Sequence, residues 1–534
     1  MPNQVSDYEY HSTPFAHQHE GFMLCRDEIA FALLMEQGTG KSKIAIDKTA
    51  YLYNKGKVGA LLVIAPNGVH ENWILNEIPK HLPPYIERDI AYYVGSGSTS
   101  AERKALANLA RMDRPALKVL AINFEAMSTA KGCEFVHNFI RVFRTIGVVD
   151  ESTGMKNHKS KRTVAIGGLR PLLPYRMILT GTPVTEGPED IFAPFEFLDP
   201  YFLPCSSYYA HTARYCELVS DPASLVGLRP FEVKQVMALR NIRSTPRGRM
   251  AQLPARDEDG KKQYKNLDEL QRIIAKHSFR VTKDQCLDLP PKLFTKIYVR
   301  LSDNQKRIYA NLTHERMAEH EGMEMTAAVA MTRMIRHQQV IGGFFAPDPV
   351  EELDAEDNVV VIRRGATLTV AIDPKNNRIE ALIEFLENHP GKAIIWARFK
   401  SELKAITKAL DEHFGKDSSC ELHGDIKSSD RQESIRKFQE EALPRYAVAN
   451  PAAKGVSRGQ TMTMASTVVY YSNTFSLEDR LQSEDRAHRI GLVHPVLYAD
   501  MVALDTIDEK IIDALRNKKD VADMITGDAI RGWI

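Results

Sequence analysis

The chain has 534 residues, of which 43% are hydrophobic and 26% are charged, and its formal net charge is +1. This composition is typical of a soluble globular protein with length for about three or four domains, and it excludes a protein that binds nucleic acid through overall positive charge. The six cysteines include no C-x2-C pair. Their spacing argues against a zinc site and favours reduced thiols in an intracellular protein, in a bacterial or host cytoplasm or in a eukaryotic nucleus. No apolar run approaches the ~18 residues of a membrane span and the N-terminus is polar, so we expect neither secretion nor a membrane segment.

Gln18 precedes the first apolar segment, and its amide could contact one edge of an adenine, although such residues also occur at ordinary helix starts. An apolar run at 31–35 then predicts a buried strand that ends in a glycine turn. The turn and the start of the following helix comprise Gly38, Thr39, Gly40, Lys41 and Ser42. Glycines let backbone N–H groups approach phosphate oxygens, and the helix dipole favours negative charge there. We expect Lys41 to reach terminal phosphates and the Ser42 hydroxyl to contact Mg²⁺. Met35 occupies the first glycine position of the strict phosphate-loop pattern, so an ordinary glycine turn is the alternative at this point.

Further apolar runs alternate with helical patterns through the first part of the chain, at 60–65, 117–122, 145–149 and 176–179. Strands separated by helices predict a parallel sheet with crossover helices, the α/β class, in which ligands bind at the carboxyl ends of strands. The glycine turn, Asp150-Glu151 and the Thr-Gly-Thr-Pro sequence at 180–183 all follow such strand ends. We place the first domain at 1–198 and predict one convergent site at this edge of its sheet.

Asp150 and Glu151 follow an apolar strand directly, which favours a site over two solvated acids in a loop. Asp150 could hold Mg²⁺ through water, and Glu151 could take a proton from an attacking water. Phosphoryl transfer needs mainly positioning, charge neutralisation and one carboxylate base, so these groups suffice for it.

Basic residues mark two candidate nucleic-acid surfaces. Lys156 and Lys159 lie just after the acidic pair, where a phosphate contact and a merely solvated face are both open interpretations. The strand pattern stops over 199–288, which we interpret as a largely helical insertion with a basic face that includes Arg240 and Arg243. A nuclease-like spacing of Asp221, Glu232 and Lys234 also occurs there, but it lacks a strand context and such spacing arises often by accident.

The second half begins with a segment at 289–376 that we interpret as a linker and helical entry, with a hairpin at 359–363 and 367–372. From 377 to 534 strands and helices alternate again, which predicts a second parallel-sheet domain without a glycine cradle. Its polar segment 482–489 predicts a helix that carries Arg486 and Arg489 on one face, suited to reach a nucleotide across a cleft. A surface helix with internal ion pairs is the alternative.

The motifs and their order resemble those of superfamily-two helicases, and within these the Swi/Snf-type (sucrose non-fermenting) ATPases. The resemblance covers roughly residues 11 to 517 and rests on the following sequences: Gln18, Gly-Thr-Gly-Lys-Ser at 38–42, Asp-Glu-Ser at 150–152, Leu-Thr-Gly-Thr-Pro at 179–183, Cys-Leu-Asp-Leu-Pro-Pro-Lys at 286–292, and Gln482 followed by Asp-Arg-Ala-His-Arg-Ile-Gly at 485–491.

The resemblance implies two tandem RecA-like lobes that close on ATP and Mg²⁺, with double-stranded DNA held across both. It implies that Gln18 contacts adenine, that Gln482 orders the nucleotide side, and that Arg486 and Arg489 act as arginine fingers. Gly459 would lie in a loop that couples DNA to ATP. The sequence departs from many relatives at three places: Ser152-Thr153, Gln460-Thr461 and Met35-Glu36-Gln37. None of these departures removes a group that hydrolysis needs, although the first lacks a histidine with a coupling role.

We therefore expect a DNA-dependent ATPase that translocates along double-stranded DNA and could remodel a protein bound to it. One alternative keeps the motor but separates strands, as a DNA or RNA helicase does. A second is a nucleotide-gated DNA-binding assembly factor without turnover, against which the intact Lys41, Glu151 and Arg489 count. The weakest is a motor fused to a nuclease.

Overall fold

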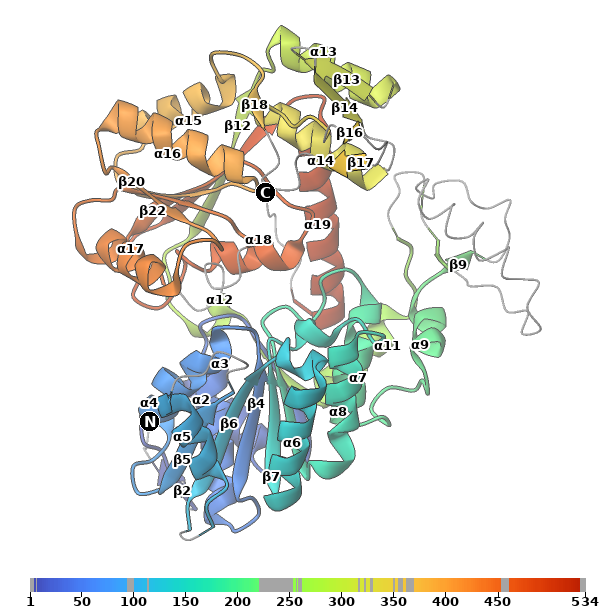
Figure 1. Ribbon diagram of the computed structural model, residues 1–534. Helices are drawn as coiled ribbons and strands as arrows, with labels where there is room; N and C mark the ends of the chain where they lie inside the picture. The colour runs from blue at the N-terminus through green and yellow to red at the C-terminus, as the bar shows by residue number, and fades with distance from the viewer. Residues whose placement is uncertain are drawn as a thin grey trace. The chain divides into compact units, whose positions relative to one another are not determined.

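Two parallel β-sheets, one of seven strands and one of six, organise the chain (Figure 1). The computed structural model describes residues 4–5, 7–93, 100–112, 115–219, 253–255, 257, 262–315, 317–320, 323–326, 330–348, 351–353, 359–361, 369–452 and 461–528. The first lobe comprises Met1–Leu218, Lys262–Leu289 and Lys518–Arg531, and the second comprises Val219–Lys261, Pro290–Asn517 and Gly532–Ile534. The predicted α/β class with two parallel-sheet lobes is confirmed.

The sheet of the first lobe has the strand order β11-β3-β8-β7-β4-β6-β5, and every pairing is parallel. Its strands are β3 (Ala30–Met35), β4 (Ala60–Ala65), β5 (Arg88–Tyr92), β6 (Leu117–Asn123), β7 (Thr145–Asp150), β8 (Tyr175–Leu179) and β11 (Ser278–Val281). The sequence predicts five of these strands and misses β5 and β11. Both lie at edges of the sheet, where side chains are only partly buried, so they lack the continuous apolar run of a central strand.

Helices cover both faces of this sheet, because successive strand residues point to opposite sides. In β3, Phe31 and Leu33 pack into one apolar cluster, whereas Ala32 and Leu34 pack into the other. The helices of the lobe are α1 (Ala16–Cys25), α2 (Lys41–Asn54), α3 (Val69–Asn72), α4 (Ile78–His81), α5 (Ser100–Leu109), α6 (Ala130–Val142), α7 (Lys161–Gly168), α8 (Phe192–Leu198), α9 (Tyr208–Tyr215), α11 (Leu267–Lys276) and α12 (Lys283–Cys286). Helices α1 and α2 contribute to the cluster of Phe31, and α6, α8 and α11 to the cluster of Leu34.

The segment predicted as a helical insertion contributes to the first lobe. Among its described residues, α9 and α11 are helical as expected, but Ser278–Val281 forms the edge strand β11 next to β3. Short strands also occur, with β9 (Leu218–Val219) beside β10 (Leu253–Pro254) and, near the N-terminus, β1 (Gln4–Val5) antiparallel to β2 (Tyr8–Glu9).

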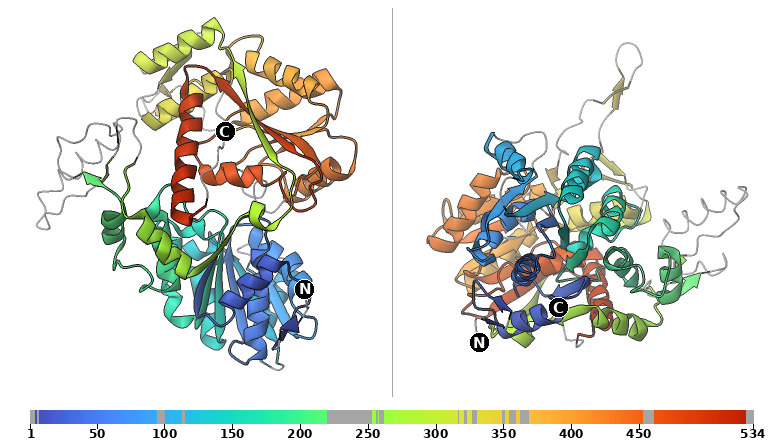
Figure 2. Two further views of the ribbon diagram at one scale, coloured as in Figure 1. Left: turned by 180° about the vertical axis from the view of Figure 1, so that it is seen from behind. Right: turned by 90° about the horizontal axis from the view of Figure 1, so that it is seen from below.

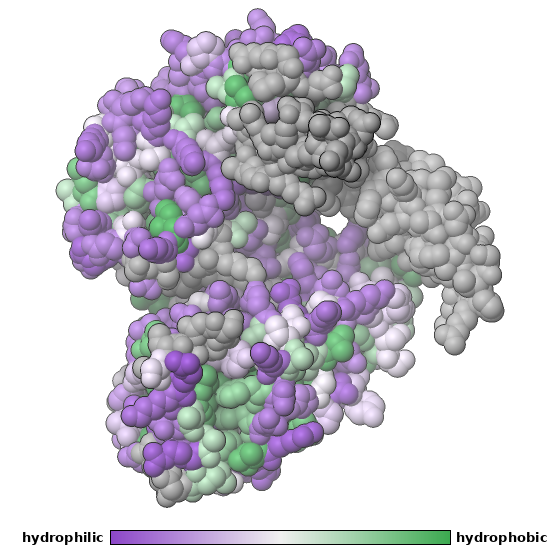
Figure 3. All heavy atoms as spheres, in the orientation of Figure 1, coloured by the Kyte–Doolittle hydropathy of each residue, from purple (hydrophilic) through white to green (hydrophobic). Residues whose placement is uncertain are grey.

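The sheet of the second lobe has the order β12-β23-β22-β19-β21-β20, again with parallel pairings. The strands of this sheet are β12 (Lys292–Val299), β19 (Lys392–Trp396), β20 (Ser419–Leu422), β21 (Tyr446–Ala449), β22 (Ala465–Tyr470) and β23 (Val496–Ala503). The helices of the lobe are α13 (Asp303–His314), α14 (Ala330–Ile341), α15 (Asn377–Asn388), α16 (Lys400–Phe414), α17 (Ser428–Glu440), α18 (Leu477–Glu484) and the first part of α19 (Ile507–Thr526). Strand β12 lies within the segment predicted as a linker and helical entry. Hydrophilic residues predominate on the outer side of α15 and α17 (Figure 3), whereas the apolar faces of α15 and α16 pack on the sheet.

The hairpin predicted at 359–363 and 367–372 is wrong in its pairing. Strand β17 (Val359–Val361) pairs antiparallel with β16 (Glu351–Leu353), and β18 (Val370–Ala371) pairs with β15 (Phe344–Phe345). Phe345 and Ile372 are both buried in a small cluster with residues of α13, which holds β18 against β15. A second hairpin, β13 (Met317–His320) with β14 (Met323–Thr326), lies nearby in sequence.

The helix predicted through Arg486 and Arg489 is also wrong, because α18 ends at Glu484. The N–H of Arg486 still bonds to the carbonyl of Ser483, but its own carbonyl accepts a hydrogen bond from Met462. The backbone therefore leaves the helical path, and both arginines lie in the turn that follows α18.

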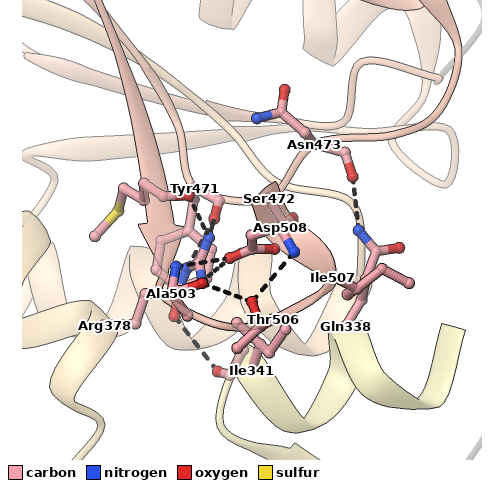
Figure 4. Close-up of polar contacts among 12 residues, drawn as sticks. Gln338, Ile341, Arg378, Tyr471, Ser472, Asn473, Ala503, Thr506, Ile507 and Asp508 are labelled. Atoms are coloured by element: carbon pink, nitrogen blue, oxygen red, sulfur yellow. Dashed lines mark hydrogen bonds and ion pairs between the residues drawn. The ribbon is translucent and has the colours of Figure 1, made fainter. Parts of the chain in front are cut away.

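A buried arginine joins three elements within the second lobe. Arg378, at the start of α15, donates to the carbonyl of Tyr471 from Nε (2.8 Å), to that of Met501 from Nη2 (2.8 Å) and to the Asp508 carboxylate from Nη1 (2.8 Å). Figure 4 shows the guanidinium group between Tyr471, the residue after β22, and Asp508, at the start of α19. Helix α19 is continuous to Thr526 (Figures 1 and 2). Its residues from Lys518 on belong to the first lobe. Among the described residues, no helix combines the length and apolarity needed to span a membrane.

Candidate functional site

The glycine cradle lies between β3 and α2 in the first lobe. Gly38 and Gly40 have φ of 80° and 94°, in the left-handed region that favours glycine. Gly40 is the N-cap of α2. Because glycine has no side chain to cap the helix, no side chain of this residue bonds to the first N–H groups of α2. This is the arrangement in which helix N-termini bind phosphate.

Lys41, the first residue of α2, folds back over the cradle. Its Nζ donates to the carbonyl oxygens of Met35 (2.8 Å) and Glu36 (3.1 Å). Met35 belongs to β3 and is buried, with Val281 of β11 as its register partner. The position where the formal pattern has its first glycine is therefore a strand residue, and the turn starts only after it.

The acidic pair lies two strands away from the cradle. Asp150 ends β7, where its Oδ2 accepts from the indole Nε1 of Trp73 (2.8 Å) and its Oδ1 from the N–H of Glu151 (2.9 Å). Glu151 has φ of 49°, a left-handed backbone that costs a non-glycine residue about 1–3 kcal/mol. Its Oε1 accepts from Nε2 of Gln37 in the cradle (3.3 Å). The structure thus brings the acidic pair and the cradle together, as the sequence predicts.

The Thr-Gly-Thr-Pro segment lies between these two elements, because β8 is the strand between β3 and β7. The N–H of Thr180 donates to the carbonyl of Leu33 (3.1 Å). A Cβ on Gly181 would lie 3.2 Å from the backbone nitrogen of Gln37, so glycine lets this segment approach the cradle closely. Three neighbouring strand ends therefore form one site.

Gln18 also contacts the cradle. In the first turn of α1, its Oε1 accepts from the N–H of Phe15 (3.1 Å) and its Nε2 donates to the carbonyl of Thr39 (3.1 Å). His17 contacts the same carbonyl through Nε2 at 2.8 Å. A Cβ on Gly40 would lie 2.2 Å from Nε2 of Gln18, which shows how closely the two segments approach each other.

In the second lobe, a buried network of charged side chains anchors helix α18, which precedes Arg486 and Arg489. Arg480 of α18 donates to Glu484 (2.9 Å) and, through two nitrogens, to Asp500 of β23 (2.5 and 2.9 Å). Lys292 of β12 adds an ion pair to Glu484 at 2.9 Å. The pKa of Glu484 lies below its usual range, because these two cations outweigh a burial that alone would raise it.

The predicted nucleotide-facing residues follow this network. Gln482 is buried and donates from Nε2 to Glu478 (3.2 Å). Arg486 is buried as well, and its Nε donates to the carbonyl of Gln482 (2.9 Å). Arg489 donates from Nη1 to Oγ1 of Thr461 (3.0 Å). The structure thus places the three residues together in one segment of this lobe.

Of the predicted nucleic-acid contacts, the structure describes two. Lys156 donates to Oγ1 of Thr185 (2.7 Å), and the Lys159 ammonium lies 5.4 Å from the centre of the Tyr209 ring. Arg240, Arg243 and Gly459 lie outside the described residues, as do the nuclease-like residues Asp221, Glu232 and Lys234.

Sequence reasoning missed three residues that support the site: Trp73, Gln37 and Arg280. The indole of Trp73 fixes Asp150, and the amide of Gln37 contacts Glu151. Arg280 of β11 donates to the carbonyls of Leu34 and Gly181. Trp73 follows shortly after a predicted strand end, the only hint of a role that its sequence position offers.

The residues present fit a magnesium–nucleotide complex. Hydroxyl and carboxylate oxygens are ligands that Mg²⁺ accepts, and Ser42, after β3, and Asp150, at the end of β7, offer one of each at the same edge of the sheet. Among the described residues there is no group of three or more His, Cys, Asp or Glu placed to hold a metal ion by themselves. Mg²⁺ bound mainly through phosphates needs only one or two carboxylates.

Known proteins are similar in sequence to this chain over 71% to 94% of its length. The chain is 24% identical to the ATP-dependent helicase brm of Drosophila melanogaster over 90% of its own length and 27% of the relative. It is also 24% identical to the lymphoid-specific helicase of Homo sapiens (94% of this chain, 61% of the relative) and to the putative ATP-dependent helicase/translocase YwqA of Bacillus subtilis (71% and 35%). The chain thus spans between about a quarter and three fifths of the length of these relatives. Among solved structures, the Sulfolobus solfataricus SWI2/SNF2 ATPase core in complex with dsDNA is similar at 19% identity and a TM-score of 0.38, over 98% of this chain and 95% of that one.

Two family models match in tandem. The helicase conserved C-terminal domain matches residues 375–491, within the second lobe. The SNF2-related domain matches residues 17–341, more than half of the chain. The chain therefore belongs to the SNF2-related family.

Proposed function

We propose that the protein hydrolyses ATP at the site of the first lobe and couples hydrolysis to translocation along double-stranded DNA. The observation that carries this proposal is the junction of three strand ends, where the amide of Gln37 in the cradle contacts the carboxylate of Glu151. A phosphate held by the cradle would have a carboxylate base beside it, the arrangement that phosphoryl transfer to water requires.

The residues of the first lobe have separate roles in this proposal. The N–H groups at the start of α2 and the ammonium of Lys41 bind the phosphates, and Lys41 exchanges its present carbonyl partners for phosphate oxygens. Bound Mg²⁺ would neutralise phosphate charge, with Ser42 and Asp150 as the residues that hold it. Trp73 keeps the carboxylate of Asp150 in one orientation. Glu151 accepts the proton of the attacking water, and the amide of Gln37 donates a hydrogen bond to its carboxylate.

Other roles rest on the family's motifs. Gln18 contacts the adenine, for which its amide must exchange part of its bonding to Phe15 and Thr39. Gln482, Arg486 and Arg489 of the second lobe act on the nucleotide. The buried network of Arg480 supports these roles, because it fixes α18 and the turn that follows it.

Double-stranded DNA is the proposed track. The family and the names of the relatives, which are helicases and a translocase, support a nucleic-acid motor. Lys156, Lys159, Arg240, Arg243 and Gly459 are the proposed contacts. A protein bound to the DNA is a further candidate partner, as substrate of a remodelling motor.

The test measures ATP hydrolysis with duplex DNA, single-stranded DNA and RNA. We expect duplex DNA to stimulate most, and equal stimulation by RNA would overturn the proposed track. Displacement of the third strand of a triplex without unwinding of a fork distinguishes translocation from strand separation. Lys41→Ala and Glu151→Gln should each nearly abolish turnover, with Glu151→Gln still binding ATP. If the wild-type protein binds ATP and DNA without turnover, the assembly-factor alternative replaces the motor.

A further inference from the structure

Arg280 ties together the two segments that form the cradle side of the site. Its Nη1 donates to the carbonyl of Leu34 (2.7 Å) and to that of Gly181 (3.1 Å). Leu34 lies in β3 just before the cradle, and Gly181 follows β8 in the Thr-Gly-Thr-Pro segment. One side chain therefore bridges the ends of two neighbouring strands at the point where both enter the site.

The strand that carries Arg280 is itself joined to the residues before the cradle. The N–H of Glu36 donates to the carbonyl of Val281 (3.0 Å), and the carboxylate of Glu36 accepts from the N–H of Lys283 (2.7 Å). Two hydrogen bonds, one to the backbone and one to the side chain of Glu36, therefore fix the strand that carries Arg280 beside the cradle.

On its other side, Arg280 makes a two-pronged ion pair with Asp528. Nε lies 3.2 Å from Oδ1, and Nη2 lies 2.5 Å from Oδ2. The two side chains are 18% and 11% exposed, so water screens this pair little. Burial alone would raise the pKa of Asp528, but its hydrogen bonds and the charge of Arg280 outweigh burial and hold the pKa below its usual range. A guanidinium group paired in this way has little freedom to rotate away from its carbonyl partners.

Asp528 reaches this position because residues 518–528 are docked on the first lobe. Ile525 is fully buried in the apolar cluster that also contains Leu270 and Ile274 of α11. Helix α19 ends at Thr526, and the next residue, Gly527, has a φ of 78° that turns the chain. A Cβ on Gly527 would lie 2.3 Å from Nε2 of Gln271. The docking therefore delivers the carboxylate to a defined point beside β11.

We propose that Arg280 is a positioning residue for the ATP site and that Asp528, from the far end of the sequence, holds it in place. The proposal rests on the proposed function. Without the carboxylate, the guanidinium group can leave the carbonyls of Leu34 and Gly181, and the cradle and the Thr-Gly-Thr-Pro segment lose their fixed separation. Binding constellations must be held within about 0.5 Å of their productive geometry, so ATP binding should weaken.

The test compares Asp528→Asn with Glu186→Gln in the full chain. Glu186 forms an ion pair with Lys518 (2.8 Å), so Glu186→Gln removes another anchor of the same segment without touching Arg280. For Asp528→Asn we expect a rise of roughly tenfold in KM for ATP and in the Kd of a fluorescent ATP analogue. For Glu186→Gln we expect values within twofold of the wild type. Asp528→Glu should restore part of the loss, because it keeps the charge.

A double-mutant cycle addresses the link between the two residues. Arg280→Lys keeps the charge, but an ammonium group cannot serve two carbonyls and a carboxylate in the same geometry. Arg280→Lys should therefore weaken ATP binding, and the addition of Asp528→Asn should cost less than it does alone, since the residues act as one unit. Additive effects, equal effects of Asp528→Asn and Glu186→Gln, or unchanged binding in Asp528→Asn would each overturn the proposal. If the wild-type protein binds the analogue but does not hydrolyse ATP, the proposed function is wrong. The role of Arg280 and Asp528 in nucleotide binding would then be judged from the Kd of the analogue alone.

Discussion

Replacement of Arg378 by methionine should destabilise the second lobe strongly. Arg378 is 2% exposed, and its charge is compensated by Asp508 and by the carbonyls of Tyr471 and Met501 (Figure 4). Methionine fills a similar volume but leaves the carboxylate of Asp508 buried without its cation. Breaking a buried pair in this way costs about 3–5 kcal/mol. With a slope of roughly 2–3 kcal/mol per molar urea, the unfolding midpoint of the lobe should fall by about 1–2.5 M.

The assay needs a probe for this lobe alone. The chain has three tryptophans, of which Trp396 is buried in β19 of the second lobe. In a Trp73→Phe/Trp533→Phe background, fluorescence during urea unfolding therefore follows Trp396, which avoids averaging over two lobes that need not unfold together. Arg436→Met is the matched control, because Arg436 pairs with three glutamates on the exposed surface of α17 and should leave the midpoint nearly unchanged. Equal midpoints for the two variants would refute the argument from burial.

Three further predictions concern the first lobe. Gly40→Ala should weaken ATP binding at least tenfold, because the new Cβ would lie 2.2 Å from the side-chain amide nitrogen of Gln18. Gly56→Ala is the control, since Gly56 also has a positive φ but has open space around it, and this change should cost only about 1 kcal/mol of stability. Titration with a fluorescent ATP analogue should show weakened binding in the first variant and unchanged binding in the second. Trp73→Phe removes the donor that fixes Asp150, so turnover measured against Mg²⁺ concentration should need roughly tenfold more metal, and an unchanged Mg²⁺ dependence would exclude this role. Burial lowers the pKa of His81 to about 4. The unfolded chain therefore binds the extra proton between about pH 6.5 and 4, and the contribution of His81 to stability is complete above that window and lost as the pH falls through it. The urea midpoint of the first lobe should accordingly depend less on pH in His81→Gln than in the wild type.

The central strands of both sheets could be predicted from the sequence because they are buried on both faces. Ala60–Ala65 and Tyr446–Ala449, for example, consist of apolar residues throughout. Edge strands could not be predicted in this way. β11 alternates partly exposed with buried residues, and β12 exposes Leu293 and Tyr298, so neither shows the continuous pattern of a central strand.

The residues that carry the chemistry were predictable, but those that position them were not. Lys41, Asp150 and Glu151 stand next to strand ends in the sequence, so local pattern is sufficient to find them. Their supports come from far away: 77 residues separate Trp73 from Asp150, and 114 separate Gln37 from Glu151. Such pairs depend on the packing of the finished fold. The end of α18 also depends on a distant residue. The polar pattern continues past Glu484, but the carbonyl of Arg486 accepts a hydrogen bond from the N–H of Met462 and the backbone leaves the helical path.

The departure of the cradle from its formal pattern also follows from packing. A glycine at the first position normally allows the chain to turn out of the strand there. In this protein Met35 remains in β3, because β11 pairs with β3 up to this residue and its side chain fills the apolar cluster behind the sheet. The carbonyl oxygen of Met35 still accepts a hydrogen bond from the ammonium group of Lys41. The start of the cradle is thus fixed by the neighbouring strand rather than by a glycine turn, which places Arg280, on that same strand, in a position to control it.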